Sequence, residues 1–492
     1  MEPNERQHKA ITKTEGPCII LAGAGTGKSF TVVEKVNHLV NTEQKFRPDE
    51  ILCLTFSNEA TDSLKTKIQD RLQTSVSVTV KTFHSFCQDV LREDGHLVSE
   101  DFEIILPDDA KILMHKDLGI SPYWSNRYVT TIHTARDFGI SLEDIKQYFQ
   151  KLDKNLKQLL PENPGENADK LRTELQTLHL QPQNTKEERK EVRERKKEIT
   201  QCLEAYDEWE KFRDFIEAWQ NYDKLKQEKN YVDFADLNNY ALQLFRQYGA
   251  EKYVNQYKYV FVDEFQDTNK LQFELIEYIA QHHNITVVGD PNQSIYGFRG
   301  AYKENFDHFK QSFNVQQDDL VELDKSYRST NKILNLAHQL IQNNYENPDE
   351  CVKVQNIDDV EGDDVNVVEL VNRDEEARFV ADKVQEAIDN GVPKEEICVL
   401  HRTHQQAQVL KQVFELKGIP VISAGKQNLL QKPEIRTTVS YLSILANLIE
   451  RSGFGEQSWW NLFHYQNSLS PEDSVKIGRF LKKKRDEGVA ID

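Results

Sequence analysis

The sequence has few cysteines and no long apolar run, and each absence excludes a class of protein. Its six cysteines are scattered through 492 residues without a CxxC pair. Neither a zinc or iron–sulfur site nor a disulfide framework is therefore expected. No apolar stretch approaches the roughly 20 residues of a membrane span, and the first residues are polar rather than those of a signal peptide. The sequence predicts a soluble, cytoplasmic protein that makes no contact with membranes.

Basic residues are also in deficit, because 62 Lys and Arg face 81 Asp and Glu, a net charge of −19. This excess of negative charge argues against a basic coat over the whole surface for nucleic acid. A local basic groove is still compatible with it, since phosphate contacts need only a few cations in one place. The length predicts about three or four domains.

What the sequence does have is a glycine-rich stretch between an apolar run and a helical pattern. Ile19 to Leu21 reads as the end of a buried strand, and Phe30 to Val40 has apolar residues at helical spacing. Strand, glycine-rich loop and helix in this order are the context of a phosphate-binding loop. The alternative is an ordinary glycine-rich turn before a helix. The residues of the predicted nucleotide-binding loop are Ala22, Gly23, Ala24, Gly25, Thr26, Gly27, Lys28 and Ser29.

Each part of this loop has a physical role. Gly23, Gly25 and Gly27 allow backbone N–H groups to wrap phosphate oxygens where a Cβ would intrude. Lys28 would reach the β- and γ-phosphates, and the Ser29 hydroxyl would hold Mg²⁺. The sequence therefore predicts a protein that binds a nucleoside triphosphate with Mg²⁺.

A glutamine precedes the loop on a short predicted helix. Gln7 follows Asn4, which is a suitable helix cap. Its amide offers a donor and an acceptor, which suit the N6 and N7 edge of adenine. The alternative is a solvated surface side chain.

Strands alternate with helices around these segments, and this alternation predicts an α/β fold with a parallel sheet. Glu50 to Phe56 reads as a strand, the next helix runs to about Leu72, and Val76 to Val80 reads as a further strand. From Cys87 to Asn230 strands vanish and charged helical patterns dominate. We interpret this region as a helical insertion, whose surface is either a solvated face or a DNA contact.

The α/β pattern resumes with Tyr231 to Leu237 at the start of a helix and a strand at Lys258 to Val262, which leads into two carboxylates. Asp263 would hold Mg²⁺ through water, and Glu264 would orient and deprotonate the attacking water. An acidic pair after a strand is by itself more often a solvated loop. The phosphate-binding loop upstream favours the catalytic interpretation.

The next predicted strand, Ile285 to Asp290, is followed by a loop with both polar and aromatic side chains. Gln293 could sense the γ-phosphate. Tyr296 and Phe298 offer stacking faces beside Arg299, a combination typical of single-strand binding. The alternative is that the two aromatic side chains belong to the core.

A second α/β segment is expected further along the chain. Strands are expected at Val365 to Leu370, at Glu396 to Leu400 and at Ile419 to Ile422. Helices are expected at Glu375 to Asn390 and at Gln405 to Lys417.

In this order and spacing, these stretches resemble the UvrD/Rep/PcrA family of superfamily 1 DNA helicases. The resemblance implies an ATP-dependent helicase or translocase that moves 3′ to 5′ on single-stranded DNA. It implies that Gln7 contacts adenine, that Tyr327 stacks on it, and that Arg328 reaches the γ-phosphate from across a cleft. The segment from Gly289 to Ala301 would couple the γ-phosphate to DNA. The DNA-contacting residues that the resemblance implies are Thr55, Phe56, Asn58, Thr82, Phe83, His84, Tyr296, Phe298 and Arg299.

The family architecture implies four parts with two RecA-like domains. Domain 1A would comprise residues 1–86 and 229–322, and the helical domain 1B residues 87–228. A partial domain 2A would comprise residues 323–425, and the start of a helical domain 2B residues 426–492.

One departure from the family pattern affects the expected activity. The last two family motifs, which include a second arginine on the γ-phosphate, do not occur between Thr437 and Asp492. The chain is expected to be the N-terminal part of a longer protein, or else a short member completed by a partner. The catalytic set that remains is Lys28, Asp263, Glu264, Gln293 and Arg328.

The sequence leaves three functions open. The first is a helicase acting on single-stranded and forked DNA. The second is the motor subunit of a helicase–nuclease or a repair or defence complex. The third is a nucleotide-gated DNA-binding module that does not unwind.

Overall fold

The computed structural model describes residues 2–94, 96–160, 164–180, 185–295, 297, 301, 304–348, 351–422, 438, 441 and 442. The chain divides into two compact units, Met1–Val365 and Asn366–Asp492. In the described ranges no helix is both long enough and apolar enough to cross a membrane. All six cysteines are free thiols.

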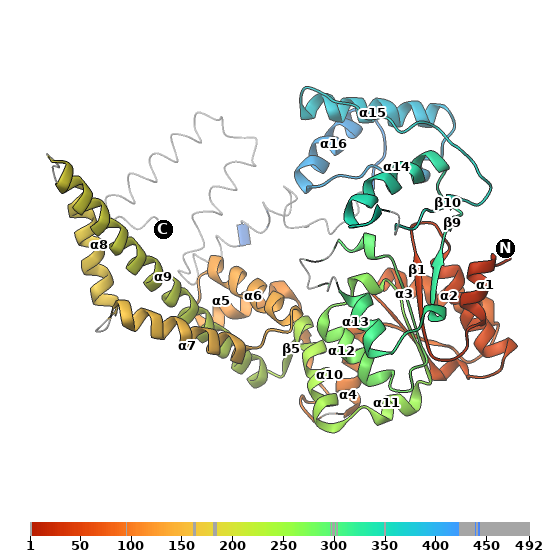
Figure 1. Ribbon diagram of the computed structural model, residues 1–492, viewed down its shortest axis with the longest axis horizontal. Helices are drawn as coiled ribbons and strands as arrows, with labels where there is room; N and C mark the ends of the chain where they lie inside the picture. Colours follow the sequence, from red (N-terminus) through yellow and green to blue (C-terminus); the bar gives the residue numbers. More distant parts are fainter. Residues whose placement is uncertain are drawn as a thin grey trace. The chain divides into compact units, whose positions relative to one another are not determined.

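The first unit is built on a six-stranded sheet in which every neighbouring pair is parallel (Figure 1). Its strands, in spatial order, are β3 (Thr79–Thr82), β2 (Ile51–Thr55), β6 (Tyr259–Val262), β7 (Ile285–Gly289), β1 (Pro17–Ala22) and β8 (Leu320–Leu323). Every residue of β2, β6 and β7 is buried, as expected for parallel strands covered on both faces. This sheet confirms the predicted α/β fold.

Helices cover both faces of the sheet. They are α1 (Glu5–Thr12), α2 (Lys28–Asn37), α3 (Asn58–Leu72), α4 (Phe83–Asp94), α10 (Phe234–Tyr248), α11 (Glu251–Gln256), α12 (Lys270–Ile279) and α13 (Asn305–Ser312). Alternate residues of β1 point to opposite faces. Cys18 and Ile20 belong to the cluster with α2 and α3, whereas Ile19 belongs to the cluster with α4, α10 and α12.

The helical insertion leaves the sheet after α4 and returns before α10. It contains β4 (Glu103–Ile105), α5 (Pro107–Leu118), α6 (Pro122–Asp137), α7 (Leu142–Leu159), α8 (Pro164–Leu180), α9 (Lys186–Glu228) and β5 (Tyr231–Asp233). Strand β4 lies within residues 87–230, where no strand was expected, and it forms because it pairs in parallel with β5. The 43 residues of α9 give a helix of about 65 Å at 1.5 Å per residue, and α7 and α8 pack along it (Figure 1). Residues 231–233 were expected at a helix start but form a strand, because they pair with β4.

Buried charges hold the base of this insertion. Asp233 is fully buried and accepts hydrogen bonds from Lys226 Nζ at 2.8 Å and from the Tyr222 hydroxyl at 2.9 Å. Arg136 Nη1 lies 2.6 Å from Asp236 and 3.3 Å from Asp233. Burial alone would raise the pKa of Asp233, but these cations hold it well below its usual value. The network therefore ties α6 and α9 of the insertion to the start of α10.

Breaking this network by Asp233→Asn is expected to lower the free energy of unfolding by about 3–5 kcal/mol, because buried cations lose their counter-charge. Urea denaturation monitored by circular dichroism measures the change. Asp169→Asn is the matched control: it removes one partner of the exposed ion pair with Arg172, which is worth only about 0–1 kcal/mol. Equal effects of the two substitutions would contradict the structural role of the network.

After β8 the first unit ends in a small α/β segment. Strands β9 (Lys325–Ser326) and β10 (Gln355–Asn356) pair in parallel, and α14 (Asn331–Ile341) lies between them in the sequence. In the second unit, α15 (Arg373–Asp389) and α16 (His404–Leu416) pack around Ala381, Phe414 and Ile419. These two helices confirm the predicted helical segments.

The three strands expected in this part of the chain are not observed. Residues 365–370, 396–400 and 419–422 are described and contain no strand. A strand requires a neighbour that satisfies its backbone N–H and C=O groups, and none of the described residues pairs with these three segments. Several of their apolar side chains are open to solvent, with Val367 95% and Ile422 99% exposed, whereas Ile419 is buried against α15 and α16. The predicted helical part from 426 to 492 lies almost entirely outside the described residues.

Candidate nucleotide and nucleic-acid site

The glycine-rich loop joins the end of β1 to the start of α2, as predicted. Gly25 and Gly27 have φ angles of +78° and +85°, in the left-handed region that favours glycine. A Cβ on Gly25 would lie 2.6 Å from Arg328 Cβ, and one on Gly27 would lie 2.7 Å from Gln7 Nε2. Helix α2 begins at Lys28, so its first N–H groups face the loop. This cradle fits a phosphate group.

Gln7 and Tyr327 meet beside the loop although 320 residues separate them in the sequence. The Tyr327 hydroxyl donates to Gln7 Oε1 at 3.2 Å and accepts from Asn4 Nδ2 at 3.0 Å. Gln7 is fully buried, and its Nε2 donates to the carbonyl of Thr26 at 3.1 Å. The Tyr327 backbone N–H donates to the Gly25 carbonyl at 2.8 Å. These contacts place both residues that we predict to recognise adenine at the same end of the loop.

The geometry limits how Gln7 can contact a base. Its amide oxygen already accepts from the Asn4 backbone N–H at 3.0 Å as well as from the Tyr327 hydroxyl. One N–H of its amide group has a partner in the Thr26 carbonyl. A contact with adenine through both a donor and an acceptor therefore requires Gln7 to exchange one of these partners.

The predicted catalytic lysine and glutamate are in direct contact. Lys28 Nζ lies 2.9 Å from Glu264 Oε2, and their side chains are 14% and 36% exposed. Glu264 follows β6 in the left-handed conformation, with φ +49°. Burial, and then the charge of Glu264, raise the pKa of Asp263 to about 6, although Lys28 acts in the opposite direction. The end of β6 and the start of α2 thus converge as an ATP-hydrolysing site requires.

The donor set at this end of the sheet suits magnesium. Ser29 is the second residue of α2, next to Lys28, and contributes a hydroxyl; Asp263 contributes a carboxylate. Both are hard oxygen ligands of the kind that Mg²⁺ takes together with water and phosphate. A divalent cation would also favour the ionised form of Asp263, which its surroundings disfavour. Groups of three or more His, Cys, Asp or Glu that could hold a metal without a nucleotide do not occur among the described residues.

The two predicted phosphate sensors are differently placed. Gln293 Nε2 donates to Asp290 Oδ2 at 2.8 Å, which fixes Gln293 beyond the end of β7. Arg328 lies against Gly25 and is exposed. Its guanidinium makes no ion pair or hydrogen bond with any residue in the described ranges. Arg328 is therefore a cation beside the phosphate loop that is available to an anionic ligand.

A cavity of about 260 Å³ gathers four of the predicted DNA-contacting residues. Thr55, Phe56, Phe83 and His84 all line it. Burial lowers the pKa of His84, which favours the neutral imidazole. Phe83 is only 4% exposed and Thr55 is fully buried, so Phe56 and His84 are the side chains best placed to meet a base.

The other predicted DNA contacts do not line this cavity. Asn58 is exposed at the start of α3. Thr82 accepts a hydrogen bond from the Ser85 backbone N–H at 3.2 Å and thereby supports the start of α4. Tyr296, Phe298 and Arg299 lie outside the described residues.

Comparison with protein families shows to which family the chain belongs. Residues 3–314 match the UvrD/REP helicase N-terminal domain, and residues 321–454 match the UvrD-like helicase C-terminal domain. The chain belongs to the UvrD/REP helicase family. The predicted resemblance is thereby confirmed.

Individual members of the UvrD/REP family align with almost the whole chain. The ATP-dependent DNA helicase PcrA of Staphylococcus aureus strain Mu50 is 28% identical over 497 residues, covering 97% of this chain and 60% of the relative. PcrA of Staphylococcus epidermidis strain ATCC 35984 is 29% identical with the same coverage. The chain thus spans 60% of the length of these curated relatives.

The cavity also shows which residues sequence reasoning missed for this UvrD/REP chain. Phe234, His133 and Asp137 line it together with the predicted residues. Phe234 meets His84 edge to face, with ring centroids 5.7 Å apart, and is 37% exposed. The exposure of Phe234 could not be predicted from the sequence. Its position directly after Asp233, the N-cap of α10, was nevertheless a signal that its ring lies at the end of a helix, near the surface. His133 comes from α6 of the insertion, which nothing in the sequence places beside β2.

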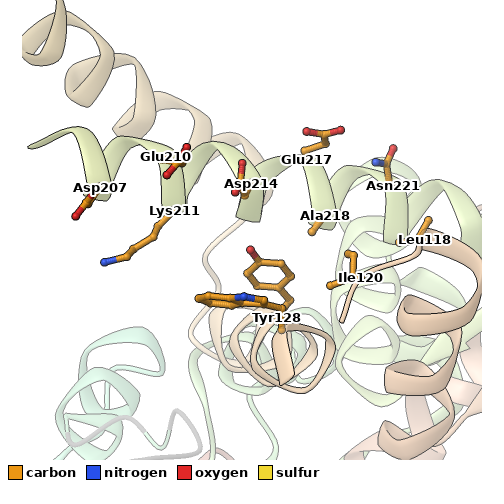
Figure 2. Close-up of a pocket in the computed structure, with 11 residues that line it drawn as sticks. Leu118, Ile120, Tyr128, Asp207, Glu210, Lys211, Asp214, Glu217, Ala218 and Asn221 are labelled. Atoms are coloured by element: carbon orange, nitrogen blue, oxygen red, sulfur yellow. The ribbon is translucent and has the colours of Figure 1, made fainter. Parts of the chain in front are cut away.

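A larger cavity, of about 470 Å³, lies within the helical insertion (Figure 2). It is lined by Trp124 and Tyr128, whose rings stack with centroids 5.4 Å apart. Its wall on α9 carries one ammonium, from Lys211, and four carboxylates, from Asp207, Glu210, Asp214 and Glu217, so its net charge is negative. Phosphates would be repelled by this wall. On this face of the insertion, the solvated interpretation is favoured over a DNA contact.

Proposed function

We propose that the chain is the ATP-driven motor part of a DNA helicase, which moves 3′ to 5′ on a single strand. The observation that carries this proposal is the 2.9 Å ion pair between Lys28 of the phosphate loop and Glu264 at the end of β6. It supports the proposal because a cation and a carboxylate in direct contact at the phosphate loop would both act on one γ-phosphate. The family membership supports the DNA substrate.

The nucleotide chemistry follows from the charges around the loop. The backbone N–H groups at the start of α2 and the Lys28 ammonium bind the phosphates. A phosphate that engages Lys28 competes with Glu264 for the ammonium, and Glu264 is then available to accept a proton from the attacking water. Arg328 adds positive charge from the opposite side. Bound Mg²⁺, held by Ser29 and Asp263, would neutralise phosphate charge.

On the DNA side we propose that a base enters the cavity lined by Phe56 and His84. An aromatic ring gives a base a stacking surface irrespective of sequence, which suits a motor that moves along a strand. We further propose the family division for this chain: 1A as residues 1–86 and 229–322, 1B as 87–228, 2A from 323 to 425 and 2B from 426. ATP would then bind between 1A and 2A.

The test is strand separation. A forked DNA duplex with one labelled strand is incubated with the protein, Mg²⁺ and ATP, and the released strand is measured over time. Release that requires ATP supports the helicase. Hydrolysis stimulated by single-stranded DNA without release favours a motor that serves another subunit, such as a nuclease. Nucleotide-dependent DNA binding without hydrolysis favours a gated binding module.

Phe56→Ala is expected to weaken single-strand binding by about 1–3 kcal/mol, roughly 5- to 150-fold, because a stacking surface is lost. Fluorescence anisotropy of a labelled oligonucleotide measures the affinity. Phe46→Ala is the control, since Phe46 packs edge to face on Tyr259 in the core at 5.5 Å and does not line the cavity. Unchanged affinity of the Phe56 variant would show that the cavity is not the base-binding site.

A further inference from the structure

Gln266 is a buried polar residue to which the sequence motifs assigned no function. It lies on the 3₁₀ turn Phe265–Asp267, directly after the carboxylates at the end of β6, and is 4% exposed. Its Nε2 donates to Glu264 Oε2 at 2.8 Å. Its Oε1 accepts from the backbone N–H of Asp290 at 3.0 Å. One amide therefore joins the proposed general base to the end of β7.

Beyond Asp290 the contacts continue to the proposed phosphate sensor. The two carboxylate oxygens of Asp290 accept from the Asn292 backbone N–H at 3.0 Å and from Gln293 Nε2 at 2.8 Å. The Ser294 hydroxyl donates to the backbone carbonyl of Gln266 at 3.2 Å. Glu264, Gln266, Asp290 and Gln293 thus form an unbroken chain of hydrogen bonds.

The segment that carries Gln266 also reaches the proposed DNA cavity. Asp267 and Asn269 line that cavity. Asn269 pairs in antiparallel fashion with Ala301. Ser294 and Ala301 are therefore both attached to residues 264–269. The same six residues contact the nucleotide site at one end and the DNA cavity at the other.

The backbone leaves room for the Gln266 amide only because residue 289 is glycine. A Cβ on Gly289 would lie 2.3 Å from Gln266 Oε1 and 3.1 Å from the backbone N of Phe265. Any other side chain at 289 would displace the amide. This close approach is a specific feature of the site, distinct from the loop glycines that need a positive φ.

We propose that Gln266 is a positioning residue that couples the nucleotide site to DNA binding. This inference rests on the proposed motor function. A buried amide that loses a partner is destabilised, so a shift of Glu264 is followed by Gln266, and Gln266 moves Asp290 with it. The state of the γ-phosphate at Lys28 and Glu264 is in this way passed to Asp267 and Asn269, which line the proposed DNA cavity. The amide suits this task because it donates at one end and accepts at the other.

The test measures coupling as a ratio of affinities. Binding of a labelled single-stranded oligonucleotide is titrated with and without saturating Mg²⁺ and a non-hydrolysable ATP analogue. Coupling between two sites is typically 5- to 150-fold, and a change in this range is expected for the unsubstituted chain. Gln266→Met keeps the volume of the side chain but removes both hydrogen bonds. The ratio for this variant is expected to fall to within about twofold of one.

Two further variants separate coupling from stability. Gly289→Ala leaves Gln266 in place but adds a Cβ that would displace its side-chain amide. This variant is also expected to reduce the affinity ratio. Thr286→Val, on the same strand as Gly289 but away from the site, removes a buried hydrogen bond of 2.9 Å with Tyr259 of β6, and is expected to keep the full ratio. A Gln266→Met protein with an undiminished ratio overturns the proposal. A ratio of one for the unsubstituted chain contradicts the motor function itself.

Discussion

Alanine in place of Lys28 is expected to reduce ATP hydrolysis by about 10²–10³-fold, the effect of removing one preorganised charge from a transition state. Lys28 starts α2, is only 14% exposed and points at Glu264. Its loss removes the ammonium that would neutralise the β- and γ-phosphates. Hydrolysis is measured with saturating single-stranded DNA under single-turnover conditions, so that slow product release does not hide the effect.

The same variant is expected to keep most of its affinity for single-stranded DNA, because the cavity lined by Phe56 and His84 does not include Lys28. Lys9→Ala is the control for loss of one positive charge, since Lys9 is on the surface of α1 and 3.8 Å from the exposed Asp318. An equal loss of hydrolysis and DNA binding in Lys28→Ala would indicate a damaged fold. Hydrolysis at the unsubstituted rate would contradict the assigned phosphate contact.

The phosphate loop could be predicted from the sequence because its function depends on neighbours in the chain. The positive φ of Gly25 and Gly27 and the helix start at Lys28 are local properties of one short segment. Apolar runs that end in polar residues likewise located β6 and β7, since a buried parallel strand is apolar on both faces. The sequence assigned Lys28 and Glu264 to one nucleotide site but did not predict their direct contact, which the structure shows at the shared edge of the parallel sheet.

Contacts between distant segments could not be predicted in this way. The direct contact between Gln7 and Tyr327 could not be predicted from the sequence. The hydrogen bonds that the Gln7 side-chain amide makes could not be predicted from it either. The three segments expected as strands between residues 365 and 422 are rich in apolar residues, but pairing is a property of two segments and not of one. His133 and Gln266 were missed for the same reason, because their roles come from neighbours on other elements.

Gln in place of Glu264 is expected to slow hydrolysis by about 10²–10⁴-fold, the usual contribution of a general base. The substitution keeps the shape of the side chain and removes only the charge and the basic oxygen. The remaining amide oxygen can still accept from Lys28 Nζ or Gln266 Nε2, which lie 2.9 and 2.8 Å from Glu264 Oε2. Nucleotide binding should therefore persist while the chemical step fails.

This separation of binding from chemistry distinguishes the assigned roles of the two residues. Lys28→Ala should weaken nucleotide binding and hydrolysis, whereas Glu264→Gln should trap bound ATP, measured as labelled nucleotide retained on the protein after rapid filtration. Glu274→Gln is the matched control and should leave turnover unchanged. Glu274 lies on α12 and forms an ion pair of 2.6 Å with Arg246 at the surface. Normal turnover in Glu264→Gln would mean that another group takes the proton from water. In that case the Lys28–Glu264 contact would only hold the end of β6 against α2.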